Sequence, residues 1–157
     1  MLVRLIVVGK TDADYLRKGI DEYTTRLNHY IRFEIVTIPS LKDQGKAAPN
    51  EVREREAQTL LRHLEGCDRI VLLDEHGTER SSIEFASYMQ KTMNSGIRTL
   101  AFVVGGAFGF APIIYQKAND KIALSRMTMT HQMVRLFFIE QLYRAFTILR
   151  GEHYHNE

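Results

Sequence analysis

Short apolar runs along the chain alternate with longer segments in which apolar residues recur at helical spacing. The short runs are rich in β-branched residues, and runs of this length and composition predict buried β-strands. The clearest runs are Leu2–Val8, Phe33–Ile38, Arg69–Asp74 and Thr99–Val104, and Lys121–Leu124 predicts a further short strand.

Helices are predicted between these runs. Ser81 and Glu84 form an S-x-x-E capping box, which predicts a helix that continues through Met93. Pro112 suits the first turn of a short helix. Further helices are predicted over Asp12–Asn28, from a cap at Asn50 through Leu64, and over His131–Arg150, and the polar segment Leu41–Pro49 predicts a loop.

Continuous apolar strands that alternate with helices predict an α/β fold, with a mainly parallel sheet and helices on both faces. The sequence shows no internal repeat, low-complexity tract or linker, so residues 1–157 are expected to form a single domain. Ligands of such sheets bind beyond the carboxyl ends of the strands. The loops after Asp74, Val104 and Leu124 are therefore the candidate site.

The last predicted helix is apolar over more than one face, from Met133 to Leu149. A helix that is apolar nearly all round is buried. Its cover could come from a second subunit, or the helix could lie at the centre of one monomer. The sequence leaves both arrangements open.

Composition and charge narrow the class of protein. The chain is 45% hydrophobic and 25% charged, which is typical of globular domains, and its formal net charge of +2 permits an RNA partner without demanding one. Cys67 is the single cysteine, which excludes an intrachain disulfide and fits a reducing cytoplasm. The apolar start, Leu2–Val8, has neither a basic region before it nor a cleavage site, and no stretch approaches the length of a membrane span.

Four segments carry candidate chemistry, each with a plain structural alternative. Gly105–Gly109 (GGAFG) could let a ligand approach the backbone, or could be a tight strand-to-helix turn. Leu124–Met129 (LSRMTM) could surround an adenine, or could be a simple connection. His131 could contact a base or phosphate, with a neutral ring favoured at a helix N-terminus, or could be a partial cap. The tail Gly151–Glu157 is dense in side chains that stack and titrate, and it could take part in the site or be a frayed end.

Two other sites are excluded by spacing. Gly9 and Lys10 resemble the end of a phosphate-binding loop, but the position that requires the first glycine holds Arg4. His153 and His155 lack a third ligand at a useful spacing, so no metal site is expected.

Taken in order, the segments resemble the small single-domain SPOUT-class methyltransferases that methylate pseudouridine in 23S ribosomal RNA, the RlmH (YbeA-like) family. The resemblance covers essentially the whole chain, and the ordered set of motifs is specific although no single motif is. The matching segments are the opening strand with VGK at Val8–Lys10, DEY..RL at Asp21–Leu27, VLLDEHG at Val71–Gly77, FVVGGAFGF at Phe102–Phe110, Leu124–Glu152, and Tyr154 with His155.

The resemblance implies a fold, an activity and a cofactor. It implies a SPOUT-type domain with a deep trefoil knot near the C-terminus, and a homodimer that packs through the last helix. It implies methyl transfer from S-adenosylmethionine to N3 of a pseudouridine in the 23S RNA of the large subunit, on the assembled ribosome. Carried over by position, the cofactor contacts are Leu73, Gly105, Leu124, Ser125, Arg126, Met127, Thr128 and Met129.

The implied chemistry needs a proton to leave the target nitrogen, so a base, or donors that stabilise negative charge, would help. His131, Tyr154 and His155 are the candidates, with Arg135 or Arg144 as the phosphate or oxyanion partner, and the base among them stays open. The tail of one subunit is expected to complete the site of the other.

The chain departs from the family pattern in two places, and two other functions fit its motifs. Thr130 stands where proline is usual, which leaves the start of the last helix open, and His153 stands where proline or alanine is frequent. The alternatives are a SPOUT methyltransferase acting on another RNA such as tRNA, and a nonenzymatic ribosome-associated binding protein.

Overall fold

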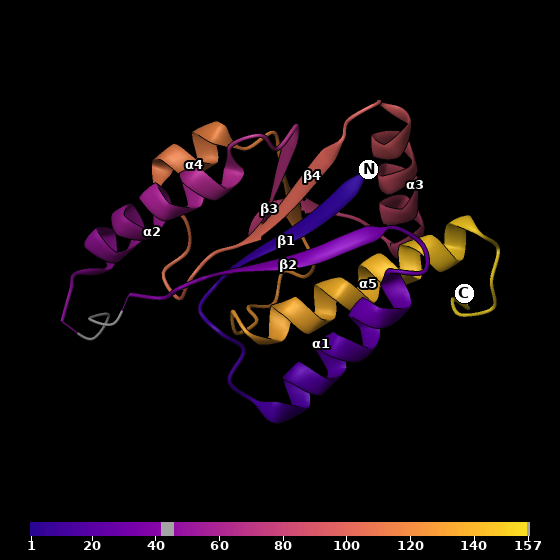
Figure 1. Ribbon diagram of the computed structural model, residues 1–157, viewed down its shortest axis with the longest axis horizontal. Helices are drawn as coiled ribbons and strands as arrows, with labels where there is room; N and C mark the ends of the chain where they lie inside the picture. Colours follow the sequence, from indigo (N-terminus) through magenta and orange to yellow (C-terminus); the bar gives the residue numbers. More distant parts are fainter. Residues whose placement is uncertain (42–45, 157) are drawn as a thin grey trace.

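The computed structural model describes residues 1–41 and 46–156, which form one parallel sheet with helices on both faces (Figure 1). The strands are β1 (Leu2–Val8), β2 (Arg32–Ile38), β3 (Arg69–Glu79), β4 (Thr99–Val104) and β5 (Asp120–Ala123). The helices are α1 (Asp14–Leu27), α2 (Pro49–Leu64), α3 (Ser82–Asn94), α4 (Pro112–Lys117) and α5 (Met133–Leu149).

The sheet has the strand order β2-β1-β4-β3-β5, and every pair of neighbours is parallel. The predicted α/β fold with a mainly parallel sheet is therefore confirmed. β4 lies at the centre, between β1 and β3, and its central residues are fully buried. This position explains why Thr99–Val104 is almost wholly apolar: both faces of a central parallel strand are covered.

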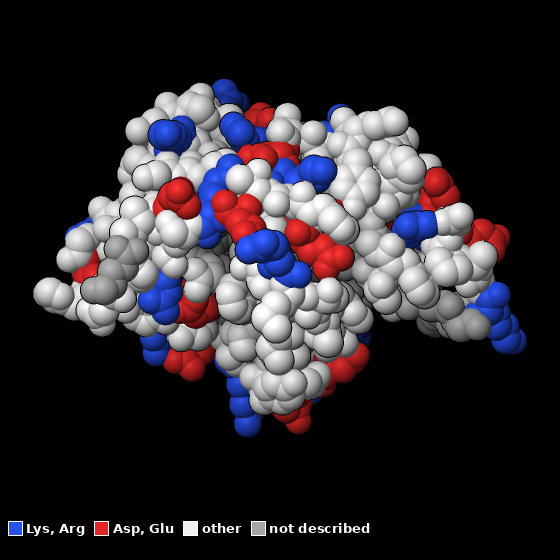
Figure 2. All heavy atoms as spheres, turned by 180° about the vertical axis from the view of Figure 1, so that it is seen from behind, with Lys and Arg blue, Asp and Glu red and all other residues white. Residues whose placement is uncertain are grey.

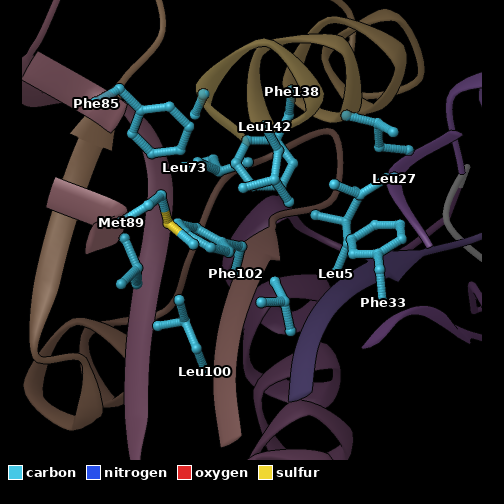
Figure 3. Packing of buried hydrophobic residues seen from close by; sticks show 14 of the residues in the cluster. Leu5, Leu27, Phe33, Leu73, Phe85, Met89, Leu100, Phe102, Phe138 and Leu142 are labelled. Carbon is cyan, nitrogen blue, oxygen red and sulfur yellow. The ribbon is translucent and has the colours of Figure 1, made fainter. Parts of the chain in front are cut away.

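Side chains that alternate along each strand enter two separate cores. Phe102 enters a core with α1, α3 and α5, whereas Val103 enters a core with α2 and α4. In the first core the ring of Phe102 lies 4.6 Å from the ring of Phe138 on α5, between centroids (Figure 3). Helices therefore cover both faces of the sheet, as the sequence predicts.

Helix α5 packs on α1 and α3 within the same chain, so most of its apolar surface is buried without a partner. Phe138 and Leu142 are fully buried, and Phe146 is 5% exposed. Met133 and Phe137 are 39% and 40% exposed on the outer side. The alternative of a central helix within one monomer thus accounts for most of α5, and only the outer side is left for a partner.

Strand β3 continues five residues beyond the end that the apolar run predicts, to Glu79. Leu73 and Thr78 both pair with Ile122 of β5, so residues 74–77 bulge out of the ladder between them. A side chain on Gly77 would lie 2.7 Å from the backbone of Ile122, so glycine lets the two strands approach. Because residues 74–77 are polar or glycine, the hydrophobic pattern does not predict that the strand continues beyond them.

One predicted helix start is wrong, and the start of the last helix, which the sequence leaves open, lies two residues after His131. Helix α2 begins at Pro49 with Ala48 as its N-cap, not at a cap formed by Asn50, because Pro49 has the backbone angle of a first helical residue. Helix α5 begins at Met133, where the hydroxyl of Thr130 accepts a hydrogen bond from the Met133 N–H at 3.1 Å.

The other predicted elements are confirmed to within two residues, and the capping box of Ser81 and Glu84 is present. The predicted loop Leu41–Pro49 lies in part outside the described residues.

Candidate functional site

A cleft of about 680 Å³ opens at the carboxyl ends of β4 and β5 and beside the bulge in β3. This is the edge at which parallel sheets bind ligands, and the volume is within the range of small-molecule sites. The segments after Asp74, Val104 and Leu124, which the sequence singles out, all contribute, and the first of them is the bulge within β3 rather than a loop. The lining residues are Arg53, 73–76, 104–110, Tyr115, Ile122, Leu124, Ser125, 127–131 and Val134.

The glycine-rich loop after β4 forms one wall of the cleft. The N–H of Gly109 donates to the carbonyl of Gly106 at 3.1 Å and closes a tight turn, and Gly109 has a φ of 75°, which favours glycine. A side chain on Gly105 would lie 3.3 Å from Gly109 and from the ring of Phe110. A larger residue at Gly105 would therefore push on the loop itself. Both readings of this segment, a tight turn and a ligand-facing backbone, are compatible with this geometry.

The loop after β5 also lines the cleft and is hydrogen-bonded to the bulge in β3. The hydroxyl of Thr128 donates to the carboxylate of Glu75 at 2.9 Å, and the hydroxyl of Ser125 accepts from the N–H of Met127 at 2.9 Å. Every residue predicted to contact a cofactor lines the cleft except Arg126. The Arg126 side chain is 87% exposed and forms an ion pair with Glu79 at 3.2 Å.

Asp74, at the start of the bulge, links it to α4. Its carboxylate accepts hydrogen bonds from the N–H of His76 at 2.8 Å and from the hydroxyl of Tyr115. Burial opposes ionisation of Asp74, but these hydrogen bonds outweigh it and hold its pKa below the usual value. Burial and the nearby carboxylate raise the pKa of Tyr115 to about 12. Asp74 is therefore a charged acceptor and Tyr115 a neutral donor.

His131 is the predicted catalytic residue that lies in the cleft. Burial, followed by the positive charge of Arg135, lowers its pKa below the usual value of 6.5. The ring is therefore neutral at neutral pH, as the sequence suggests. The cause is burial and the charge of Arg135 rather than a helix N-terminus, because His131 lies two residues before the start of α5. A neutral imidazole in a cleft can accept a proton.

Arg135 has a structural role, and its prediction as a phosphate or oxyanion partner is wrong. The residue is 2% exposed. Its guanidinium donates to the carbonyls of Val8 at 2.7 Å, Gly9 at 2.9 Å and His131 at 3.0 Å. Arg135 also donates to the hydroxyl of Thr11 at 3.0 Å, so four of its five N–H donors are used in joining the end of β1 to the start of α5.

Tyr154, His155 and Arg144 gather in a second group, the tail cluster, together with Glu140. The hydroxyl of Tyr154 donates to Glu140 at 2.9 Å, and Arg144 forms an ion pair with Glu140 at 2.6 Å. Arg144 lies 3.3 Å from Nδ1 of His155. Since a guanidinium only donates, Nδ1 accepts and a neutral His155 ring carries its proton on Nε2. In this arrangement Nδ1 of His155 is occupied as an acceptor.

The tail cluster is separate from the cleft of its own chain. Among the described residues, none beyond Val134 lines the cleft. Glu140, which holds Tyr154, lies two turns along α5, or roughly 10 Å of helix, beyond Met133. The structure thus divides the four predicted catalytic residues into His131 on one side and Tyr154, His155 and Arg144 on the other.

Several lining residues are absent from the sequence-based prediction. Asp74 ends the apolar run that the sequence singles out, and Glu75 and His76 come next, so the sheet-end rule points to them. Arg53 and Tyr115 come from helices α2 and α4 and have no local signature.

One face of the molecule carries mixed charge. On the face seen in Figure 2, acidic and basic side chains are interspersed and form no broad basic field. Within residues 1–41 and 46–156, no group of three acidic, histidine or cysteine side chains is placed to hold a metal ion. No helix of that part of the chain is long and apolar enough to cross a membrane.

Comparison with known sequences gives matches over nearly the full length. A family model described as "Predicted SPOUT methyltransferase" matches residues 1–155. A protein of Flavobacterium johnsoniae named "Ribosomal RNA large subunit methyltransferase H" is 50% identical over 157 residues, which is 100% of both chains. A protein of the same name from Porphyromonas gingivalis is 46% identical over 100% of both chains.

Comparison with solved structures shows a similar fold. A probable methyltransferase from Bordetella pertussis matches with a TM-score of 0.58 and 12% identity, over 92% of this chain and 95% of that chain. A probable methylase family protein from Haemophilus influenzae matches with a TM-score of 0.56 and 10% identity, over 99% of this chain and 70% of that one.

Proposed function

Because this chain belongs to the SPOUT methyltransferase family, we propose that it transfers a methyl group from S-adenosylmethionine to ribosomal RNA of the large ribosomal subunit. The observation that carries the proposal is full-length identity of 45–50% to relatives named as methyltransferases of that RNA. The cleft at the sheet edge is the place where the reaction would occur.

The residues of the cleft fit S-adenosylmethionine. Leu73, Ile122 and Leu124 offer an apolar surface for an adenine ring, and the glycine-rich loop offers backbone groups at its edge. Asp74 and Glu75 outnumber Arg53 among the charged lining groups, which suits a cationic ligand. When bound, the cofactor supplies an electrophilic methyl group. The protein then has to position the acceptor and exclude water.

The finer target follows from the family resemblance: N3 of a pseudouridine in 23S RNA, on the assembled ribosome. His131 is the residue placed to accept the imide proton, because its neutral ring faces the cleft. Tyr154 offers a ring for stacking on the base, and Arg144 offers a cation for a phosphate.

We also propose that two chains pair through the outer side of α5, in antiparallel orientation. Met133, Phe137, Glu140 and Arg144 share this side at helical spacing, and the first two are large and exposed. Antiparallel pairing would bring the tail cluster of one subunit toward the cleft of the other. That arrangement would unite the two groups that one chain keeps apart.

A trefoil knot, a single domain and a cytoplasmic location are further parts of the proposal. The knot is supported by membership of the SPOUT family, whose resemblance implies it. Pulling on the two termini of a single molecule tests it. A knot would leave the stretched chain shorter than roughly 3.3–3.6 Å per residue allows.

The activity is tested with purified protein, S-adenosylmethionine carrying a labelled methyl group, and ribosomes from a strain that lacks this methyltransferase. We expect label in 23S RNA of the ribosomes, and N3-methylpseudouridine after digestion to nucleosides. Free 23S RNA and bulk tRNA are the comparison substrates. Label in tRNA alone would favour the alternative function, a SPOUT methyltransferase that acts on tRNA. Calorimetric binding of the cofactor without methyl transfer to any RNA would favour a nonenzymatic binding protein.

A further inference from the structure

Glu56 on α2 is a buried carboxyl group outside the cleft lining. It is 6% exposed and belongs to the inward side of α2, between Val52 and Leu60. Apolar residues normally hold such positions, because burying a carboxyl group costs free energy. Burial accordingly raises the pKa of Glu56.

Gly106 lies directly against this carboxyl group. A methyl group on Gly106 would lie 2.6 Å from Oε2 and 2.7 Å from Oε1 of Glu56, well inside van der Waals contact. Gly106 is not at a positive φ, so its backbone would accept other residues. A side chain at this position would therefore have to displace the carboxyl group of Glu56.

The contact joins the core under α2 to the wall of the cleft. Val104 is fixed in β4, and Phe110 and Ala111 are buried in the core that α2 and α4 share. Between these anchors the loop spans residues 105–109 with the Gly106–Gly109 turn at its centre. Glu56 lies behind that turn, while Gly106 itself lines the cleft.

We propose that Glu56 is a positioning residue for the cofactor: its carboxyl group supports Gly106 from behind and holds the loop of residues 105–110 in the shape that lines the cleft. The inference rests on the proposed function, since it takes S-adenosylmethionine as the ligand of the cleft. Glu56 acts through Gly106 and does not touch the ligand.

The first test measures cofactor affinity by calorimetry with the full-length protein. Glu56→Ala should weaken S-adenosylmethionine binding at least tenfold, because the loop loses its support. Glu56→Gln keeps the shape and one oxygen, and should bind within threefold of wild type. Glu54→Ala, at an exposed position on the same helix, is the control and should bind as wild type does. If Glu56→Ala does not fold, Glu56→Asp takes its place, because it withdraws the carboxyl group by one methylene. It should weaken S-adenosylmethionine binding by the same factor.

A second readout needs no cofactor. Amide hydrogen exchange of residues 105–110 should be faster in Glu56→Ala than in wild type, whereas exchange in β1 should be unchanged. Gly106→Ala should weaken binding about tenfold by pressing on the carboxyl group. Its effect should shrink in the Glu56→Ala background, where the methyl group has room.

Wild-type affinity and wild-type loop exchange in the alanine variant would overturn the inference, and so would additive losses in the double variant. Both results leave the proposed function intact as long as the wild-type protein binds S-adenosylmethionine. Failure of the wild type to bind it would instead contradict the proposed function.

Discussion

The hydroxyl oxygen of Tyr154 lies 3.0 Å from that of Tyr23 on α1. Because Tyr154 donates its own proton to Glu140, Tyr23 supplies the proton of this second bond. The ring of Tyr154 also packs against Tyr143, with 4.8 Å between centroids. These contacts order the tail on the helices of its own chain, where the sequence left a frayed end open.

The tail should serve the reaction and not the cofactor. Deleting residues 154–157 should abolish methylation of ribosomes, since it removes a stacking ring worth about 1–3 kcal/mol and the donor His155. Cofactor affinity measured by calorimetry should stay within about tenfold, or roughly 1.4 kcal/mol. Deleting residues 156–157 alone is the control and should leave the rate unchanged. Loss of cofactor binding in the longer deletion would place the tail in the cofactor site.

Two adjacent phenylalanines on α5 should respond differently to a negative charge. Phe137→Asp should give folded monomers in sedimentation, because Phe137 is 40% exposed on the outer side. Phe138→Asp should not fold, because Phe138 is fully buried and an unpaired charge there is costly. A wild-type protein that sediments as a monomer at micromolar concentration would contradict the proposed dimer.

Replacing Arg135 should lower stability without changing a substrate contact. Arg135→Leu leaves the carbonyls of Val8, Gly9 and His131 without their donor, which we expect to cost about 3 kcal/mol in urea unfolding. Arg62→Leu, at an exposed position on α2, should stay within about 0.5 kcal/mol of wild type. Equal stability of the two variants would show that the buried bonds contribute little.

Protonation of His131 should destabilise the fold in acid. Its pKa is lowered in the folded protein, so the stabilising contribution of the neutral ring is complete above pH 6.5 and is lost as pH falls through the lowered value. His131→Gln removes this dependence. Melting temperatures of the two proteins should therefore run parallel above pH 6.5 and converge or cross below it. Parallel curves throughout would contradict the lowered pKa; His29→Gln, at an exposed position, controls for loss of an imidazole.

The sequence by itself determined the strands, the alternation with helices and the edge of the sheet that holds the cleft. These features have local signatures. A strand covered on both faces must be apolar throughout, as Thr99–Val104 is, and a capping box such as that of Ser81 and Glu84 satisfies backbone groups within one turn. The loop after Leu124 was found in the same way, because ligands of a parallel sheet bind beyond its strand ends.

The tertiary structure alone decided which polar groups meet. Glu56 and Gly106 are distant in sequence, and no local sequence pattern around either residue predicts their contact. The sequence predicted Arg135 as a phosphate or oxyanion partner, whereas in the structure its guanidinium donates to three carbonyl groups from distant parts of the chain. The bulge at residues 74–77 depends on pairing with β5, and the position of Tyr154 depends on α1. Hydrophobic periodicity records only whether a residue faces the core, whereas these contacts depend on how separate elements are placed in space.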